Sequence, residues 1–128
     1  MAARAPVLRL LPGRLGVARL EGGAPIPAWA DGAGVVSITR RAGELSIVCA
    51  EARIPAEVRV QRGWRALEVA GPLDFQETGI LASIAAPLAA AGISLFAVAT
   101  FDTDLVLVRE ATLSRAVEAL RQAGCQVQ

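Results

Sequence analysis

The sequence predicts an α+β fold in which two helices alternate with strands in the order strand, helix, strand, strand, helix, strand. Two segments with helical periodicity each end at a glycine, and the segments around them are short and alternate apolar with polar residues. Hydrophobic residues make up 54% of the 128 residues and charged residues 20%, which is typical of a packed domain rather than a disordered chain. The length allows one domain, or two very small units.

The first strand and the first helix of this pattern follow one another directly. In residues 65–71, Leu67 and Val69 alternate with Ala66, Glu68 and Ala70, which predicts a short strand. A helix is expected from about Glu77 to Ala91, and Gly92 then fits the left-handed position beyond a helix end. The apolar stripe that we expect to face the core consists of Ile80, Leu81, Ile84 and Leu88.

The rest of the second half completes the pattern. Residues 93–101 carry no charge, so we expect a strand that is buried on both faces. A turn leads to a strand over 104–109, a helix over 112–123 that stops at Gly124, and a brief last strand over 125–128. The predicted inward positions of the second helix are Leu113, Ala116, Val117 and Leu120. This order of elements is the split βαβ arrangement of the ferredoxin-like class.

The first half looks like a degenerate copy of the same order. Its expected strands cover residues 14–21, 34–40, 44–49 and 57–62. Residues 26–31 and 50–54 stand where the two helices would be, and Arg41-Ala42-Gly43 makes the hairpin turn. We therefore predict two units, a degenerate one over 1–62 and a complete one over 63–128.

The missing residue types exclude several functions. The chain has no His, Lys, Asn or Tyr, so the commonest general base and metal ligand are both absent. Cys49 and Cys125 are the only cysteines; we expect both to be reduced, and they are too few for a zinc site. A net charge of +1 does not favour nucleic acid as a partner. The residues thus predict neither an enzyme nor a metal or cofactor site.

One segment is long enough to cross a membrane. Residues 79–101 carry no charge over 23 positions. Pro87 interrupts the run and Gly92 ends its helical part, so we interpret it as a helix followed by a strand. With no sign of a secretion signal, we expect a cytoplasmic protein that does not contact a membrane.

The run GPLDFQETGILASIAAPLAAAGISLFAVATFDTDLVLV, residues 71–108, resembles the second domain of small bacterial proteins with two ACT domains. The stretches ELSIVCAEARIP and GWRALEVAG resemble the junction between the two domains in that family. The resemblance implies a ferredoxin-like ACT fold and a regulatory protein that binds an amino acid or a similar small zwitterion. The functionally understood relatives are the tandem-ACT cytosolic arginine sensors of animals.

In those sensors a Glu-x-Gly-Ile segment and a Thr-Phe-x-x-Asp segment hold the ligand between two ACT domains. The matching segments here are 77–80 and 100–104. The resemblance therefore implies a ligand site at Glu77, Thr78, Gly79, Ile80, Thr100, Phe101 and Asp104. Simpler interpretations stay open: Glu77 as an acid on a helix dipole, Gly79 as a close-packing position, and Asp104 as a polar residue of a hairpin.

The chemistry of these residues agrees with an amino-acid ligand. Amides at a helix N-terminus suit a carboxylate, and Gly79 lets a ligand approach the backbone. Glu77 and Asp104 suit an ammonium or guanidinium group, and Phe101 can pack on a planar cation. The family also implies a homodimer and an unnamed downstream partner. The alternative function is a protein-interaction or dimerisation module whose ligand pocket has decayed.

Overall fold

The computed structural model describes residues 5–74, 76 and 78–128, and the chain forms two compact units. The smaller unit is continuous and covers Gly13–Trp64. The larger unit combines the segment that ends at Pro12 with Arg65–Gln128. The N-terminal segment thus belongs with the second half of the chain, whereas the sequence grouped it with the first half.

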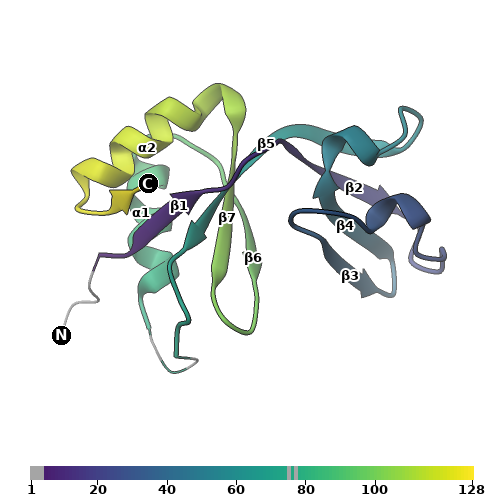
Figure 1. The fold of residues 1–128 in the computed structure, drawn as a ribbon, viewed down its shortest axis with the longest axis horizontal. Helices are drawn as coiled ribbons and strands as arrows, with labels where there is room; N and C mark the ends of the chain where they lie inside the picture. The colour runs from purple at the N-terminus through teal and green to yellow at the C-terminus, as the bar shows by residue number, and fades with distance from the viewer. Residues whose placement is uncertain (1–4, 75, 77) are drawn as a thin grey trace. The chain divides into compact units, whose positions relative to one another are not determined.

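The larger unit is a mixed α+β fold, as the sequence predicted. Its sheet has the order β6-β7-β5-β1-β8, and two helices pack against it (Figure 1). The strands are β1 (Val7–Leu10), β5 (Arg59–Val69, of which the C-terminal part lies here), β6 (Phe96–Ala99), β7 (Asp104–Arg109) and β8 (Gln126–Val127). The helices are α1 (Ile80–Ala90) and α2 (Leu113–Gln122), and one 3-10 turn (Glu110–Thr112) precedes α2.

Strand β1 was not predicted, and it changes the sheet. It pairs antiparallel with β5, with Leu8 opposite Val69, and parallel with β8, with Leu8 opposite Val127. It therefore lies between two strands that would be neighbours in a plain split βαβ sheet. Four residues with an arginine among them give too weak an alternation to predict a strand, although Leu8 is fully buried.

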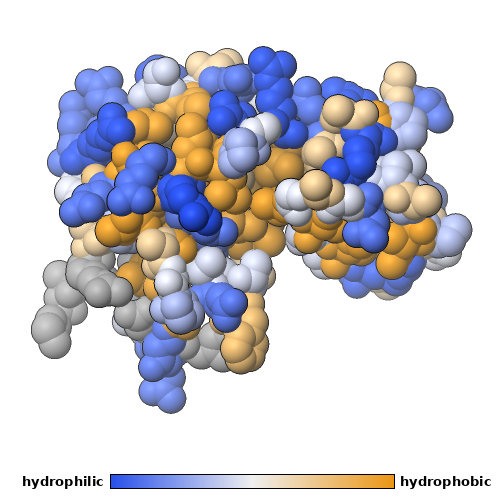
Figure 2. Space-filling model, in the orientation of Figure 1, coloured by the Kyte–Doolittle hydropathy of each residue, from blue (hydrophilic) through white to orange (hydrophobic). Residues whose placement is uncertain are grey.

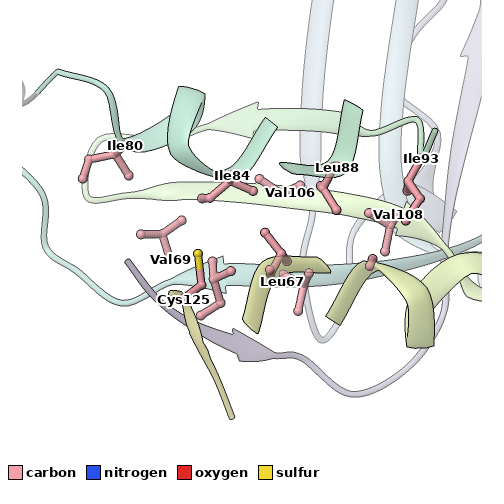
Figure 3. Close-up of a cluster of buried hydrophobic side chains, with 12 residues drawn as sticks. Leu67, Val69, Ile80, Ile84, Leu88, Ile93, Val106, Val108 and Cys125 are labelled. Carbon is pink, nitrogen blue, oxygen red and sulfur yellow. The ribbon is translucent and has the colours of Figure 1, made fainter. Parts of the chain in front are cut away.

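The core of the larger unit lies between the sheet and the two helices. Figure 3 shows Ile84 and Leu88 of α1 pointing toward strand residues such as Leu67 and Val106. On the face drawn in Figure 2, hydrophilic residues of α2 lie over an apolar layer. Both helices end as predicted, because Gly92 and Gly124 adopt positive φ angles of 73° and 97°. The buried core residues are Leu8, Leu67, Val69, Ile80, Ile84, Leu88, Ile93, Val106, Val108, Ala116, Leu120 and Cys125.

Two expectations about burial were wrong. Leu81, placed on the inward stripe of α1, is 39% exposed, because Ile80, Ile84 and Leu88 already fill the side that faces the sheet. The uncharged strand β6 is not buried on both faces: it pairs only with β7, and Ala97 and Ala99 are exposed. The strand that is buried along its length is β7.

The smaller unit consists of strands with two single 3-10 turns. Its order is β3-β4-β2-β5, with β2 (Leu15–Leu20), β3 (Ser37–Arg41), β4 (Glu44–Ala50) and the N-terminal part of β5. One-turn helices at Ala28–Ala30 and Glu51–Arg53 occupy the positions where the degenerate helices were expected. Its core consists of Ala18, Ala30, Leu45, Ile47, Cys49 and Ile54. That this unit is a degenerate ACT copy stays a prediction.

Strand β5 is longer than the sequence predicted. The strands expected over 57–62 and 65–71 form one strand of 11 residues, Arg59–Val69. Gly63, with φ of 77°, absorbs a register shift between the Leu15–Trp64 and Val17–Gln61 pairs. The Gly63 amide donates a hydrogen bond of 2.8 Å to Glu51 Oε1, which satisfies the group that leaves the ladder. A glycine inside an alternating run marks a bulge, not a break.

The uncharged run over 79–101 forms α1 and then β6, as interpreted, but α1 continues through Pro87 and it is Gly92 that follows its end. Among the residues that the structure describes, no helix combines the length and the apolar character that crossing a membrane requires.

We predict that Leu88→Ala destabilises the protein by about 2–5 kcal/mol, because Leu88 is fully buried and its removal leaves a cavity. Leu81→Ala, on the same helix but 39% exposed, is the matched control and should cost clearly less. Urea denaturation followed by circular dichroism measures both. Equal losses for the two variants would contradict the described orientation of α1.

Candidate functional site: a pocket at the start of α1

A pocket of about 330 Å³ lies in the larger unit where three segments meet. The segments are the loop after β5, the first turn of α1 and the turn between β6 and β7. The residues that line it are Leu73, Asp74, Gly79, Ile80, Leu81, Ala82, Ala99, Thr100, Phe101, Asp102, Thr103 and Asp104. Every described wall thus comes from the unit that carries the ACT resemblance.

The turn between β6 and β7 is held by its two threonines. The backbone amide and the hydroxyl of Thr100 both donate to the Thr103 carbonyl, at 2.9 and 2.7 Å. The Thr103 amide donates to Thr100 Oγ1 at 3.2 Å, and the Thr103 hydroxyl donates to the Val69 carbonyl at 2.6 Å. These bonds fix the turn to the end of β5, so the carboxylates of Asp102 and Asp104 are carried on a rigid support.

The loop after β5 is bonded to the same turn. The Leu73 amide donates a hydrogen bond of 2.6 Å to the Asp102 carbonyl. A Cβ atom at Gly71 would lie 3.1 Å from that carbonyl oxygen, so glycine at residue 71 favours the close approach of the two backbones. Further along the loop, Asp74 Oδ1 accepts a hydrogen bond from the Gln76 amide at 2.8 Å. This bonding brings Asp74 to the pocket wall.

Helix α1 contributes its positive end. Gly79 is the N-cap residue, with φ of 82°. Because glycine has no side chain, it makes no side-chain capping hydrogen bond with the first turn. The first intrahelical bond runs from the Ser83 amide to the Gly79 carbonyl at 2.9 Å. The amides of the first turn have no acceptor within a helix, and the helix dipole adds positive potential there. Since Gly79, Ile80, Leu81 and Ala82 line the pocket, this end of it suits an anion.

The opposite character comes from three carboxylates and an aromatic ring. Asp74, Asp102 and Asp104 line the pocket, and Asp104 is half-buried. Phe101 is 80% exposed, which is unusual for a phenylalanine and leaves a large apolar face beside the carboxylates. The pocket therefore offers groups for a cation and for an anion within one cavity.

Five of the seven residues expected from the sequence line this pocket: Gly79, Ile80, Thr100, Phe101 and Asp104. Thr78 is exposed and is not among the lining residues, and Glu77 lies outside the described residues. The sequence missed Leu73 and Asp74. Its only signal for them was the break after the strand at Pro72 and Asp74, which predicts a loop but not its proximity to the β6–β7 turn.

The described residues of the site form no metal-binding group, and neither cysteine is among those that line the pocket. Within residues 5–74, 76 and 78–128, no group of three or more His, Cys, Asp or Glu side chains is placed to hold a metal ion. Cys49 is buried in the core of the smaller unit and Cys125 in the core of the larger unit, and both are free cysteines. Burial raises the pKa of both, and the Arg53 guanidinium opposes this in part at Cys49.

Comparison with known proteins identifies the protein family. Residues 59–122 match the family model described as the ACT domain, and the chain belongs to this family. The match covers the complete α1–β6–β7–α2 part of the larger unit and all the lining residues of the pocket. A second family model, described as an N-terminal domain, matches residues 13–57.

Among curated proteins, the chain is similar to the cytosolic arginine sensor for mTORC1 subunit 1. It is 47% identical to the human protein over 64 residues, which are 48% of this chain and 20% of the sensor. The bovine sensor is 45% identical over 60 residues, 18% of its length. The chain thus spans about a fifth of the length of the curated relatives it matches.

The solved structures agree on the fold. A protein from Agrobacterium tumefaciens is 48% identical with a TM-score of 0.93, covering 99% of this chain and 94% of that one. The regulatory subunit of aspartate kinase from Thermus thermophilus is 11% identical with a TM-score of 0.63, covering 94% of this chain and 99% of that subunit. At that identity the second likeness concerns the fold alone, and it is consistent with the predicted ferredoxin-like ACT fold.

We predict that both cysteines react slowly with a thiol reagent in the native protein at pH 8, because burial raises their pKa values and lowers the thiolate fraction. Ellman's reagent should release two equivalents only after denaturation. Fast release of one equivalent from the folded chain would show that one of the two sites is open to solvent.

Proposed function

We propose that this protein is a regulatory protein that binds a free amino acid in the pocket at the start of α1, and that it is not an enzyme. The observation that carries the proposal is the meeting of the first turn of α1 with Asp104 and Phe101 around one cavity. Membership of the ACT family and the likeness to an arginine sensor support a regulatory role. The sensor's name also supports a cytoplasmic location.

The ligand would bind by its two charged ends. Its α-carboxylate accepts hydrogen bonds from the amides of the first turn of α1, where Gly79 leaves room for a close approach. Its ammonium group pairs with Asp104, and the flat face of Phe101 covers the ligand. Arginine is one candidate, because a guanidinium group would find further carboxylates at Asp74 and Asp102.

A second copy of the chain would complete the site. Phe101 and Leu81 line the pocket and are 80% and 39% exposed, so a ligand bound between them would stay half open to water. Strand β6 ends at Ala99, which lines the pocket. A strand of the second copy that pairs with β6 would therefore lie beside the pocket. We therefore include a homodimer in the proposal, with the downstream partner unnamed.

The alternative is a protein-interaction module with a decayed pocket. The observation that favours it is the β6 edge, which pairs on one side only and carries no charge or proline from 93 to 101. Such edges accept a strand from another chain. The two functions differ in what occupies the larger unit, a small molecule or a protein strand.

The first test of the proposal is a thermal-shift screen of the full chain against the twenty amino acids. A ligand at a hundredfold excess over its Kd stabilises the folded state by about 2.7 kcal/mol, which raises the melting temperature by several degrees. Asp104→Asn should abolish the shift, because the ammonium loses its charged partner. The matched control is Glu118→Gln, an exposed carboxylate of α2.

A shift that survives Asp104→Asn unchanged would contradict the proposed role of this carboxylate. The absence of a shift with every amino acid at millimolar concentration would overturn ligand binding and favour the interaction module.

The homodimer is a separate prediction. Light scattering at tens of micromolar protein should give twice the chain mass of 13.3 kDa. Ala97→Lys places a charge on the β6 edge and should shift the mass toward the monomer, whereas Ala86→Lys, on an exposed part of α1, tests the helix face instead. A monomer mass for the unmodified chain would contradict the prediction.

A further inference from the structure

A second, smaller pocket of about 180 Å³ adjoins the first. All the described residues that line it are apolar. Strand β1 contributes Val7 with the preceding Pro6, and the end of β5 contributes Val69 and Ala70. The rest of the described wall consists of Ala5, Leu73 and Ile80. Because the side chains of these residues are apolar, the pocket favours an apolar ligand group over a charged one.

The two pockets share a wall. Leu73 and Ile80 line both of them, with the carboxylates on one side and the apolar strand residues on the other. Figure 3 shows Ile80 and Val69 facing each other at one end of the core. A molecule seated against Leu73 and Ile80 in the first pocket therefore lies next to an apolar cavity.

Backbone pairing fixes the shape of the second pocket. The Ala70 amide donates to the Val7 carbonyl at 2.8 Å, and Leu8 is the strand partner of Val69. The Gln126 amide donates to the Pro6 carbonyl at 3.3 Å, which ties the preceding segment to β8. The cavity is thus built between paired strands, and it exists because β1 is inserted beside β5.

We infer that the second pocket is a side-chain subsite, which takes the aliphatic side chain of an amino acid whose charged groups bind in the first pocket. The inference rests on the proposed function and names the ligand class: α-amino acids with an aliphatic side chain of three or four carbons. A dry cavity of about 150 Å³ is known to hold a benzene ring, so 180 Å³ is ample for such a chain.

The apolar lining also determines which ligands are rejected. Each methylene buried in the subsite tightens binding by about fourfold, the equivalent of about 0.8 kcal/mol. A guanidinium or ammonium group placed there would lose its water and gain no partner from the described walls. The subsite therefore favours leucine, norvaline or norleucine over arginine and lysine.

The test is calorimetry on the full chain with a series of increasing side-chain length: glycine, alanine, 2-aminobutyrate, norvaline and norleucine, with arginine for comparison. The expected result is a stepwise fall in Kd of about fourfold per methylene, and arginine weaker than norvaline. Binding of the series with equal affinity, or tightest binding by arginine, would overturn the subsite and leave the proposed function standing. No binding by any member would overturn the proposed function and the subsite together.

A filled-cavity variant localises the effect. Ala70→Leu puts three carbons at the mouth of the second pocket, at an exposed position whose backbone bonding to Val7 is kept. It should bring the affinity for norleucine down to that for alanine while alanine binds as before. Ala86→Leu, the same change on an exposed part of α1, is the matched control and should keep the full series.

Xenon gives a readout that does not depend on an amino acid. Xenon binds in apolar cavities of this size, so the methyl signals of Val7, Val69 and Ile80 should shift in wild-type protein and not in Ala70→Leu. Unchanged dependence on chain length in Ala70→Leu, together with an unchanged xenon response, would overturn the subsite.

Discussion

The end of β5 at Val69 is the point on which the larger unit depends. Val69 pairs with Leu8 of β1 on one edge, and its carbonyl accepts the hydroxyl of Thr103 from the β6–β7 turn at 2.6 Å. Its side chain is buried against Ile80 at the start of α1. Two strand ends, a turn and a helix terminus are thereby held within one small volume, and both pockets lie around it. The polar pocket forms where hydrogen bonds gather the loops, and the apolar one forms where strands pair.

How far the sequence predicts the fold depends on how local the signal is. Helices α1 and α2 and their glycine stops were predictable, because periodicity and a left-handed glycine act within one or two turns. The exposure of β6 was not predictable, because the lack of charge in a segment does not indicate whether its strand lies at the edge or in the centre of a sheet. Strand β1 was not predicted, because it is stabilised by pairing with strands about 60 and 120 residues away rather than by a pattern within its own four residues. The strands over 57–62 and 65–71 were predicted as separate, because the alternation is interrupted at the bulge around Gly63.

The residues of the candidate site also fall into those that the sequence predicts and those that it does not. Gly79, Ile80, Thr100, Phe101 and Asp104 could be named from two short segments that match a family pattern, and they line one pocket. Asp74 could not, because its position depends on a backbone bond between Leu73 and Asp102, which no local pattern encodes. The apolar pocket was equally beyond sequence reasoning, since Val7 of the unpredicted strand β1 and the residues just before it form part of its wall.

The insertion of β1 between β5 and β8 also makes the sheet of the larger unit depend on contacts far apart in the sequence. All the strand pairs of the smaller unit join residues within 13–64, so that unit can close while the chain behind it is still unstructured. The sheet of the larger unit needs Leu8 to meet Val69 and then Val127, contacts of high sequence separation that carry a large loop-closure cost. The smaller unit, once closed, shortens that loop by bringing residues 12 and 65 within reach of one another, as the bond between the Leu11 amide and the Ala66 carbonyl requires. Closure of the smaller unit therefore lowers the loop-closure cost of pairing β1 with β5 in the larger unit.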